Sequence, residues 1–196
     1  MSNSERQYAL LQAVIEEYVS TAKPVSSKTL VTEHGFDVSP ATIRNDLAAL
    51  EEAGLIVQPH TSAGRIPTEK GYQFYIEHFI TRKSLAARQR KALAQADTRR
   101  DDSHRRMKAL ARAMSDLTNE AVVFSHDDQS YVTGLSKITR KPDFVEREEL
   151  VQLSEVFDQL DDVMTGVQEQ IDREVQILIG EQNPIARSCS IVITQY

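Results

Sequence analysis

Two neighbouring side chains near the start of a predicted helix, Arg44 and Asn45, have the chemistry needed to read DNA bases. Arg can donate two hydrogen bonds to guanine, Asn can bond adenine through its amide, and Ala41 or the methyl group of Thr42 could touch a thymine methyl. A helix that enters the major groove makes its base contacts with residues near its N-terminus. The spacing therefore favours a base-reading helix that starts at Ser39.

Other side chains around this helix could hold the phosphate backbone. Ser39, Lys28 and the amides at the helix start could bind phosphates. Arg65, expected at the tip of a hairpin, could enter the minor groove or contact the backbone. The complete set of candidate DNA-binding residues is Lys28, Ser39, Ala41, Thr42, Arg44, Asn45, His60, Thr61, Ser62, Arg65 and Lys70.

The same residues also fit a plainer interpretation. A capped helix with one Arg and one Asn on its wet face is usually only a solvated helix, and His60 and Ser62 could be ordinary loop residues. Small winged domains also bind other proteins. Residue periodicity does not separate these alternatives.

Caps and apolar spacing predict the elements that must position these side chains. A capping-box pattern at Ser4 predicts an amphipathic helix over 5–20. Ser26 or Ser27 can cap a second short helix that stops at Gly35. These two helices precede the base-reading helix.

The third predicted helix has the clearest start in the chain, because Ser39 is a natural N-cap and Pro40 suits the first helical position. One face is apolar at helical spacing and the opposite face is small and polar. The two sets are Ile43, Leu47 and Leu50, and Ala41, Arg44, Asn45 and Ala48.

Strands over 55–58 and 64–67 and a helix capped by Thr68 follow. Three helices and a two-stranded hairpin predict a winged helix-turn-helix domain over residues 1–83. Residues 84–118 contain no Gly or Pro and predict one basic linker helix. Two hypotheses stay open for it: a coiled-coil seam between two copies, or a solvated linker whose last turns pack on the following domain.

Residues 119–196 predict a small α/β domain, so that the whole chain belongs to the α+β class. Its expected elements are strands over 121–124, 131–135, 175–179 and 189–194 and an amphipathic helix over 150–167.

Net charge differs between these regions. The chain carries 23 basic and 29 acidic side chains, and its formal charge of −6 argues against a nucleic-acid partner. By region, the basic and acidic counts are 8 and 10 in residues 1–83, 9 and 3 in 84–115, and 6 and 16 in 116–196. The first region is therefore only slightly acidic, and most of the acidic excess belongs to the last.

Catalytic, metal and membrane chemistry have little basis in the sequence. Cys189 is the one Cys and lies in an apolar strand, the five His lack the spacing of a zinc site, and no Gly-rich phosphate loop occurs. No apolar run approaches the ~18 residues of a membrane span. We expect a cytoplasmic protein that is not an enzyme and needs no cofactor.

One long stretch resembles a known family. Residues 39–75, SPATIRNDLAALEEAGLIVQPHTSAGRIPTEKGYQFY, closely resemble the N-terminal domain of the heat-inducible transcription repressor HrcA family, and the resemblance begins near Glu5. Later patches, at 110–118, 131–136 and 179–183, resemble the family's C-terminal domain. The chain passes directly from 125 to 131, where the family generally carries a long GAF-like portion with an inserted dimerisation domain. We therefore expect an abbreviated member, or a truncated sequence, with a shortened GAF-like domain for regulation and dimerisation over 119–196.

The resemblance implies a repressor of chaperone operons that binds an inverted-repeat operator in double-stranded DNA. It also implies a homodimer that leaves its operator on heat stress. A GroEL-type chaperonin would assist the repressor, and no membrane partner is expected. The alternative is a winged-helix protein-interaction module without sequence-specific DNA binding. A salt titration separates the two, because DNA binding weakens steeply as salt rises.

Overall fold

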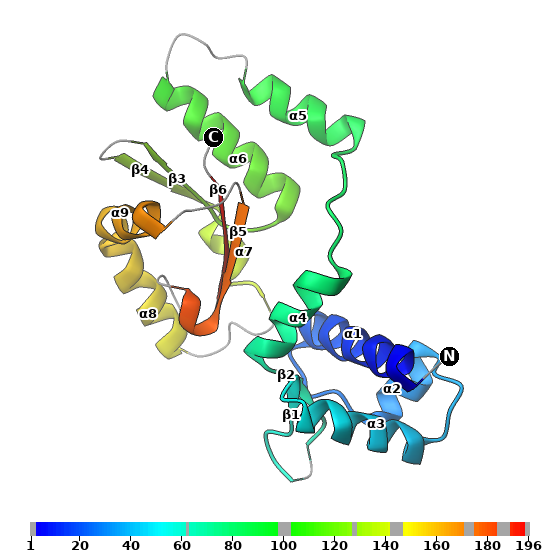
Figure 1. The fold of residues 1–196 in the computed structure, drawn as a ribbon. Coiled ribbons are helices and arrows are strands. Elements are labelled where there is room, and N and C mark those ends of the chain that lie inside the picture. Colours follow the sequence, from blue (N-terminus) through cyan, green and yellow to red (C-terminus); the bar gives the residue numbers. More distant parts are fainter. Residues whose placement is uncertain are drawn as a thin grey trace. The chain divides into compact units, whose positions relative to one another are not determined.

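A computed structural model of the protein describes residues 3–61, 63–97, 103–126, 129–141, 147–170, 175–183 and 189–194 (Figure 1). The chain divides into two compact units, residues 1–81 and residues 82–196. Each unit is a mixture of helices and strands.

The first unit is a winged helix-turn-helix domain, as its sequence predicts. Its elements are α1 (Asn3–Thr21), α2 (Ser27–His34), α3 (Pro40–Glu52), β1 (Ile56–Val57), β2 (Ile66–Pro67) and α4 (Glu69–Phe79).

Three hydroxyl side chains fix where the helices of this unit begin. Ser26, Ser39 and Thr68 each accept a hydrogen bond from a backbone N–H three residues further on, which satisfies one of the free donors of the first helical turn. The helix ends are local as well. Gly35 closes α2 with a φ of 66°, a left-handed conformation that suits Gly.

The wing is a short antiparallel hairpin in which Ile56 pairs with Pro67 and Val57 with Ile66. Val25, between α1 and α2, joins it through two backbone hydrogen bonds of 2.8 Å to Arg65. The hairpin is thus tied, next to β2, to the segment that precedes α2.

The core of the first unit lies between α1, α2, α3 and the wing. Burying apolar side chains of this size contributes about 1.5–3 kcal/mol each. The most completely buried are Leu10, Leu11, Val14, Leu30, Ile43 and Ile56.

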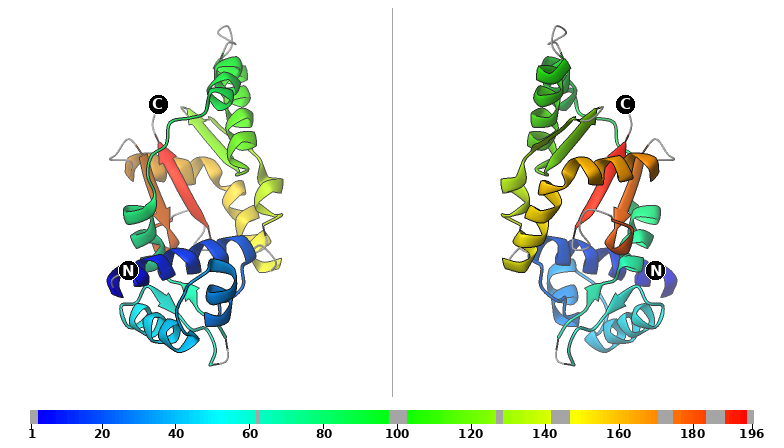
Figure 2. Two further views of the ribbon diagram at one scale, coloured as in Figure 1. Left: turned by 90° about the vertical axis from the view of Figure 1, so that its right-hand side faces the viewer. Right: turned by 90° about the vertical axis from the view of Figure 1, so that its left-hand side faces the viewer.

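The second unit contains helices and two separate antiparallel ribbons (Figure 2). Its first elements are α5 (Ala87–Asp97), α6 (Ser103–Thr118), β3 (Val122–His126), β4 (Gln129–Thr133) and α7 (Leu135–Ile138). The later ones are α8 (Arg147–Asp158), α9 (Leu160–Gln170), β5 (Val175–Ile179), the 3-10 turn η1 (Gly180–Gln182) and β6 (Ser190–Thr194).

The four strands agree with the sequence expectation. β3 pairs with β4 from Val122 opposite Thr133 to His126 opposite Gln129, and β5 pairs with β6 in the same antiparallel sense. α6 packs along both β3 and β4. Within the described ranges, no helix is long and apolar enough to cross a membrane.

Two expected helices differ from the structure. In place of one linker helix over 84–118, α5 and α6 lie side by side and antiparallel, and residues 80–86 before them are exposed and not helical (Figure 1). The apolar side of α6 is covered by elements of its own chain, since α6 packs on α5, β3 and β4. In the structure, Met107 and Ala111 of α6 are buried within the chain and do not form a seam on one continuous helix.

The amphipathic pattern over 150–167 is likewise divided into α8 and α9 by a turn at Gln159. Leu160 and Val167 of α9 are buried, while Val151 of α8 is half exposed. The apolar spacing predicts the buried side of α9 and does not reveal the turn.

Candidate nucleic-acid interface

One face of α3 is fully presented to solvent. Ala41, Arg44, Asn45 and Ala48 are exposed, and the opposite face buries Ile43, Leu47 and Leu50 in the core. The exposed set combines small residues with two hydrogen-bonding side chains, which lets the helix backbone approach a partner closely. This face is the centre of the candidate interface.

An ion pair between α1 and α3 fixes the rotation of α3. Arg6 donates to Asp46 through Nε at 2.7 Å and through Nη2 at 3.2 Å, and Asp46 is only 4% exposed. The hydrogen bond to Asp46 raises the pKa of the Arg6 guanidinium above its ordinary value. Because Asp46 lies on the buried side of α3, this pair helps to keep Arg44 and Asn45 outward.

Arg44 and Asn45 form no side-chain hydrogen bond or ion pair with any residue that the structure describes. Their donors and acceptors are therefore available to a ligand. By contrast, Arg6 is engaged with Asp46, so the two Arg side chains of this part of the unit have different roles.

Ser39 and Thr42 hold the start of α3. Ser39 Oγ accepts from the Thr42 amide at 3.1 Å and lies 2.9 Å from Thr42 Oγ1. Ser39 is exposed and Thr42 is half-buried. The two hydroxyl groups serve first as the helix cap, and a phosphate bound here would meet a helix start that is already ordered.

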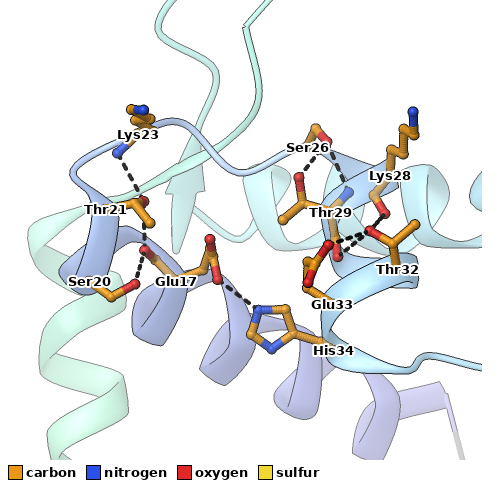
Figure 3. A network of polar contacts seen from close by, with 10 residues as sticks. All are labelled: Glu17, Ser20, Thr21, Lys23, Ser26, Lys28, Thr29, Thr32, Glu33 and His34. Atoms are coloured by element: carbon orange, nitrogen blue, oxygen red, sulfur yellow. Dashed lines mark hydrogen bonds and ion pairs between the residues drawn. The ribbon is translucent and has the colours of Figure 1, made fainter.

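Lys28 lies in the first turn of α2, the helix before α3, and its side chain is exposed. Figure 3 shows its ammonium group pointing away from the hydrogen-bonded cluster around Ser26, Thr29 and Thr32. α2 is itself fixed to α1, because His34 Nε2 lies 3.2 Å from Glu17 Oε2. Lys28 is thus a cation free for a ligand on a well-anchored helix.

Arg65 lies directly before β2, on the loop side of the strand pairs, and is bonded to α3 instead of standing at the tip of the wing. Its Nε donates to Glu51 Oε2 at 3.0 Å, and its backbone pairs with Val25. Lys70 is also engaged in the fold, since its Nζ donates to the carbonyl of Ala53 at the end of α3, 2.8 Å away. Both cations join α3 to the elements that follow it, which makes them weaker candidates for DNA contact than Arg44 and Lys28.

The tip of the wing carries His60 and Thr61, both exposed. Ser62, the remaining candidate of this loop, lies outside the described residues. The loop is held from within, because the Gln58 amide donates to the carbonyls of Thr61 and Ala63 at 3.0 and 2.9 Å. His60 and Thr61 are therefore presented on an ordered turn.

Sequence reasoning missed Arg6, Asp46, Glu51 and Gln58, which position the interface without belonging to it. A signal for Asp46 was present, since it follows Ile43 by three residues and precedes Leu50 by four. A carboxylate on the apolar side of a helix needs a partner. The identity of that partner, 40 positions away, could not be read from spacing.

Possible metal ligands and the one Cys were also located in the part of the chain that the structure describes. There, no three His, Cys, Asp or Glu side chains lie together as a metal site requires. Cys189 is half-buried just before β6.

Comparison with known proteins agrees with both units. Residues 12–69 match the model of the DeoR-like helix-turn-helix domain, and residues 70–196 match the model of the HrcA protein C terminal domain. A crystal structure of a hypothetical protein, determined at 2.2 Å resolution, has the same fold with a TM-score of 0.64 and 18% identity. The likeness covers 93% of this chain and 82% of that one.

Curated relatives carry the name heat-inducible transcription repressor HrcA. The protein of Nocardioides sp. is 43% identical over 129 residues, which cover 66% of this chain and 38% of that protein. The protein of Acidothermus cellulolyticus is 43% identical over 136 residues, covering 68% and 40%. The matched part thus spans about two fifths of the length of these relatives. With more than half of its residues matched by the family's C-terminal model, behind a helix-turn-helix domain, the chain belongs to the HrcA family.

Proposed function

We propose that the protein is a DNA-binding transcriptional repressor that inserts α3 into the major groove of its operator. The observation that carries this proposal is the exposed pair Arg44 and Asn45, which has no side-chain partner among the described residues and lies on a helix whose other face is buried and held by Asp46. Arg44 would pair with guanine and Asn45 with adenine, while Ala41 and Thr42 would contact thymine methyl groups.

Phosphate contacts would come from the elements on either side of α3. Lys28 and the capped start of α3 at Ser39 would hold one stretch of backbone, and His60 and Thr61 of the wing another. Ser62, Arg65 and Lys70 remain candidates, the last two after release from their bonds to Glu51 and Ala53. These contacts would set the register in which Arg44 and Asn45 meet the bases.

The operator would be an inverted repeat and the active species a homodimer. Two half-sites related by a twofold axis are matched by a twofold-symmetric protein, with recognition helices one or more turns of ~34 Å apart. Heat would release the operator, and the name heat-inducible transcription repressor carried by the curated relatives supports this step. The operator would lie upstream of chaperone operons, and the protein would act in the cytoplasm. A GroEL-type chaperonin would return the protein to its active fold.

A mobility-shift titration tests the proposal. The protein is mixed with a duplex that carries the family's inverted repeat, or with a duplex of the same length and composition in which the repeat is scrambled. We expect tight binding to the first duplex and weak binding to the second. The mass of the specific complex should correspond to two protein chains on one duplex.

Two results would count against the proposal in different ways. Equal affinity for both duplexes would refute the hypothesis of a sequence-specific repressor and favour the alternative, a winged-helix protein-interaction module. One chain per inverted repeat, with discrimination retained, would remove the dimer alone.

A further inference from the structure

The antiparallel pair α5 and α6, the basic hairpin, carries a large excess of positive charge. α5 has Arg88, Arg90 and Lys91 with Asp97 as its one acid, and α6 has four Lys or Arg with Asp116 as its one acid. Both acids are already engaged: Asp97 pairs with Arg106, and Asp116 accepts from Lys137 of α7 at 2.8 Å. The rest of the basic excess is not neutralised by these two carboxylates.

An aromatic ring organises two of the remaining cations. Tyr131 of β4 accepts a hydrogen bond from Arg112 Nε at 3.2 Å, and its ring centre lies 5.3 Å from Lys108 Nζ. Lys108 and Arg112 are four residues apart on α6 and therefore share one face. The phenol holds them together without cancelling their charge, and the Nη groups of Arg112 have no partner in the described part of the chain.

The cations of α5 are displayed more simply. Arg88, Arg90 and Lys91 are exposed, and their side chains form no hydrogen bond or ion pair with the residues that the structure describes. The helix has no buried residue, so these three side chains are not needed to cover a core.

We propose that the basic hairpin is a second phosphate-binding surface, which contacts the DNA backbone outside the bases read by α3. Guanidinium groups bind phosphate through two parallel hydrogen bonds, and the bond to Tyr131 uses only the Nε of Arg112. The inference rests on the proposed function, since it assumes that the duplex is already recruited by the winged domain. The basic hairpin would add affinity and salt dependence to DNA binding, without any preference for DNA sequence.

The chain's connectivity keeps the hairpin within reach of the same duplex. Residues 80–86, between α4 and α5, can span at most about 25 Å when extended. That length is shorter than one turn of duplex, ~34 Å. A hairpin on this tether can therefore meet phosphates within about a turn of the half-site.

DNA fits the hairpin better than an anionic membrane does. A helix that lies on a membrane buries large apolar side chains between the headgroups. In the described part of the chain, none of the exposed large apolar side chains belongs to α5 or α6. A surface with cations but no apolar anchor is suited to a phosphate backbone.

The test is the salt dependence of DNA binding by full-length protein carrying Lys108→Gln and Arg112→Gln. The logarithm of the binding constant falls with the logarithm of salt concentration at about 0.9 per neutralised phosphate. We expect the slope to become less steep by about 1.8 for both the inverted-repeat and the scrambled duplex. The ratio of the two affinities should not change, because phosphate contacts carry no base information.

The first double variant loses both contacts to Tyr131, which can itself disturb the fold. A second double variant therefore changes cations that do not contact this ring. Arg90→Gln with Lys91→Gln removes two exposed cations whose side chains have no hydrogen bond or ion pair with the described residues, and should reduce the slope by a similar amount. The matched control is Arg140→Gln, an exposed cation after α7, which should leave the slope unchanged.

Each outcome decides the matter. Unchanged slopes in both double variants, with operator binding intact, would overturn the hairpin proposal and leave the proposed function standing. Failure of the wild-type protein to bind any duplex at low salt would overturn both. Binding of the wild-type protein, but not the variants, to phosphatidylserine vesicles, with no effect on DNA slopes, would assign the hairpin to a membrane surface and overturn the DNA proposal.

Discussion

Arg6 near the start of α1 and Asp46 in the middle of α3 form a two-pronged ion pair, with Nε to Oδ2 at 2.7 Å and Nη2 to Oδ1 at 3.2 Å, across 40 positions of sequence. Asp46 is buried and points from α3 toward the core, while Arg44 and Asn45 point the other way. The pair therefore connects the stability of the domain to the orientation of its proposed reading face.

Removing the carboxylate should destabilise the first unit. Asp46→Ala leaves the Arg6 guanidinium without its partner, and losing a hydrogen bond to a charged group of this kind costs about 1.5–3 kcal/mol. Urea unfolding followed by circular dichroism measures the loss. Asp37→Ala is the matched control, because Asp37 is exposed, and it should change stability by less than about 0.5 kcal/mol. Equal effects of the two substitutions would refute the role assigned to the pair.

The carboxylate of Glu51 should hold the wing to α3. Its Oε1 accepts a hydrogen bond from the backbone N–H of Gln58 at 3.2 Å, and its Oε2 accepts one from Arg65 Nε at 3.0 Å. Glu51→Ala should lower the free energy of unfolding by about 1 kcal/mol and speed hydrogen exchange at the backbone N–H of Gln58. Glu52→Ala removes the same charge from the next, exposed position and should do neither. A Gln58 amide that exchanges equally slowly in both variants would contradict the assignment.

Gly71 in α4 should not tolerate a side chain. A Cβ added there would lie 2.0 Å from the carbonyl oxygen of Leu55, a backbone atom that cannot turn away. Gly71→Ala should therefore destabilise the protein by about 3 kcal/mol. Gly166→Ala in α9, where nothing lies within 4 Å of the new Cβ, should be stabilising by about 0.5–1 kcal/mol. Thermal melts of the two variants that move in the same direction would count against this packing.

Tyr75 of α4 should ionise at unusually high pH. Burial raises the pKa of its phenol above the ordinary value, and the negative charge of Glu16 and a 3.4 Å hydrogen bond to it raise it further. A raised pKa means that the folded state holds the proton more tightly than the unfolded state does. This contribution to stability is present below the unfolded pKa, near 10, and is lost as the pH rises through the folded pKa.

Tyrosinate absorbance during a pH titration checks this assignment. Glu16→Gln should move one ionisation step to lower pH, and Tyr75→Phe should remove that same step. If the step that moves in Glu16→Gln persists in Tyr75→Phe, it belongs to another tyrosine.

The winged domain could be predicted from sequence because its signals are local. Ser26, Ser39 and Thr68 cap helices through bonds to residues three positions away, and each is visible as a hydroxyl before an apolar period. The exposed set on α3 follows from the same period. The helix starts and the exposed side of α3 could therefore be predicted from the sequence.

Contacts between distant positions could not be predicted in this way. Arg65 looks like a hairpin-tip cation in the sequence, but its side chain is bonded to Glu51 of α3, 14 positions earlier. The division of 84–118 into α5 and α6 was hidden because neither Gly nor Pro marks it. Helical spacing reports which side of a helix is apolar, and it does not report where a polar helix stops.

The affinity ratio between inverted-repeat and scrambled duplex, measured for Arg44→Ala beside the wild-type protein, tests the central claim most directly. Loss of a bidentate contact to guanine should cost about 1–3 kcal/mol on the inverted repeat, roughly a 5- to 150-fold weaker binding, with little change on the scrambled duplex. Arg140→Ala, the control for removing an exposed cation, should leave the ratio unchanged. An Arg44→Ala protein that discriminates between the two duplexes as well as the wild type would contradict the assignment of α3 as the reading helix.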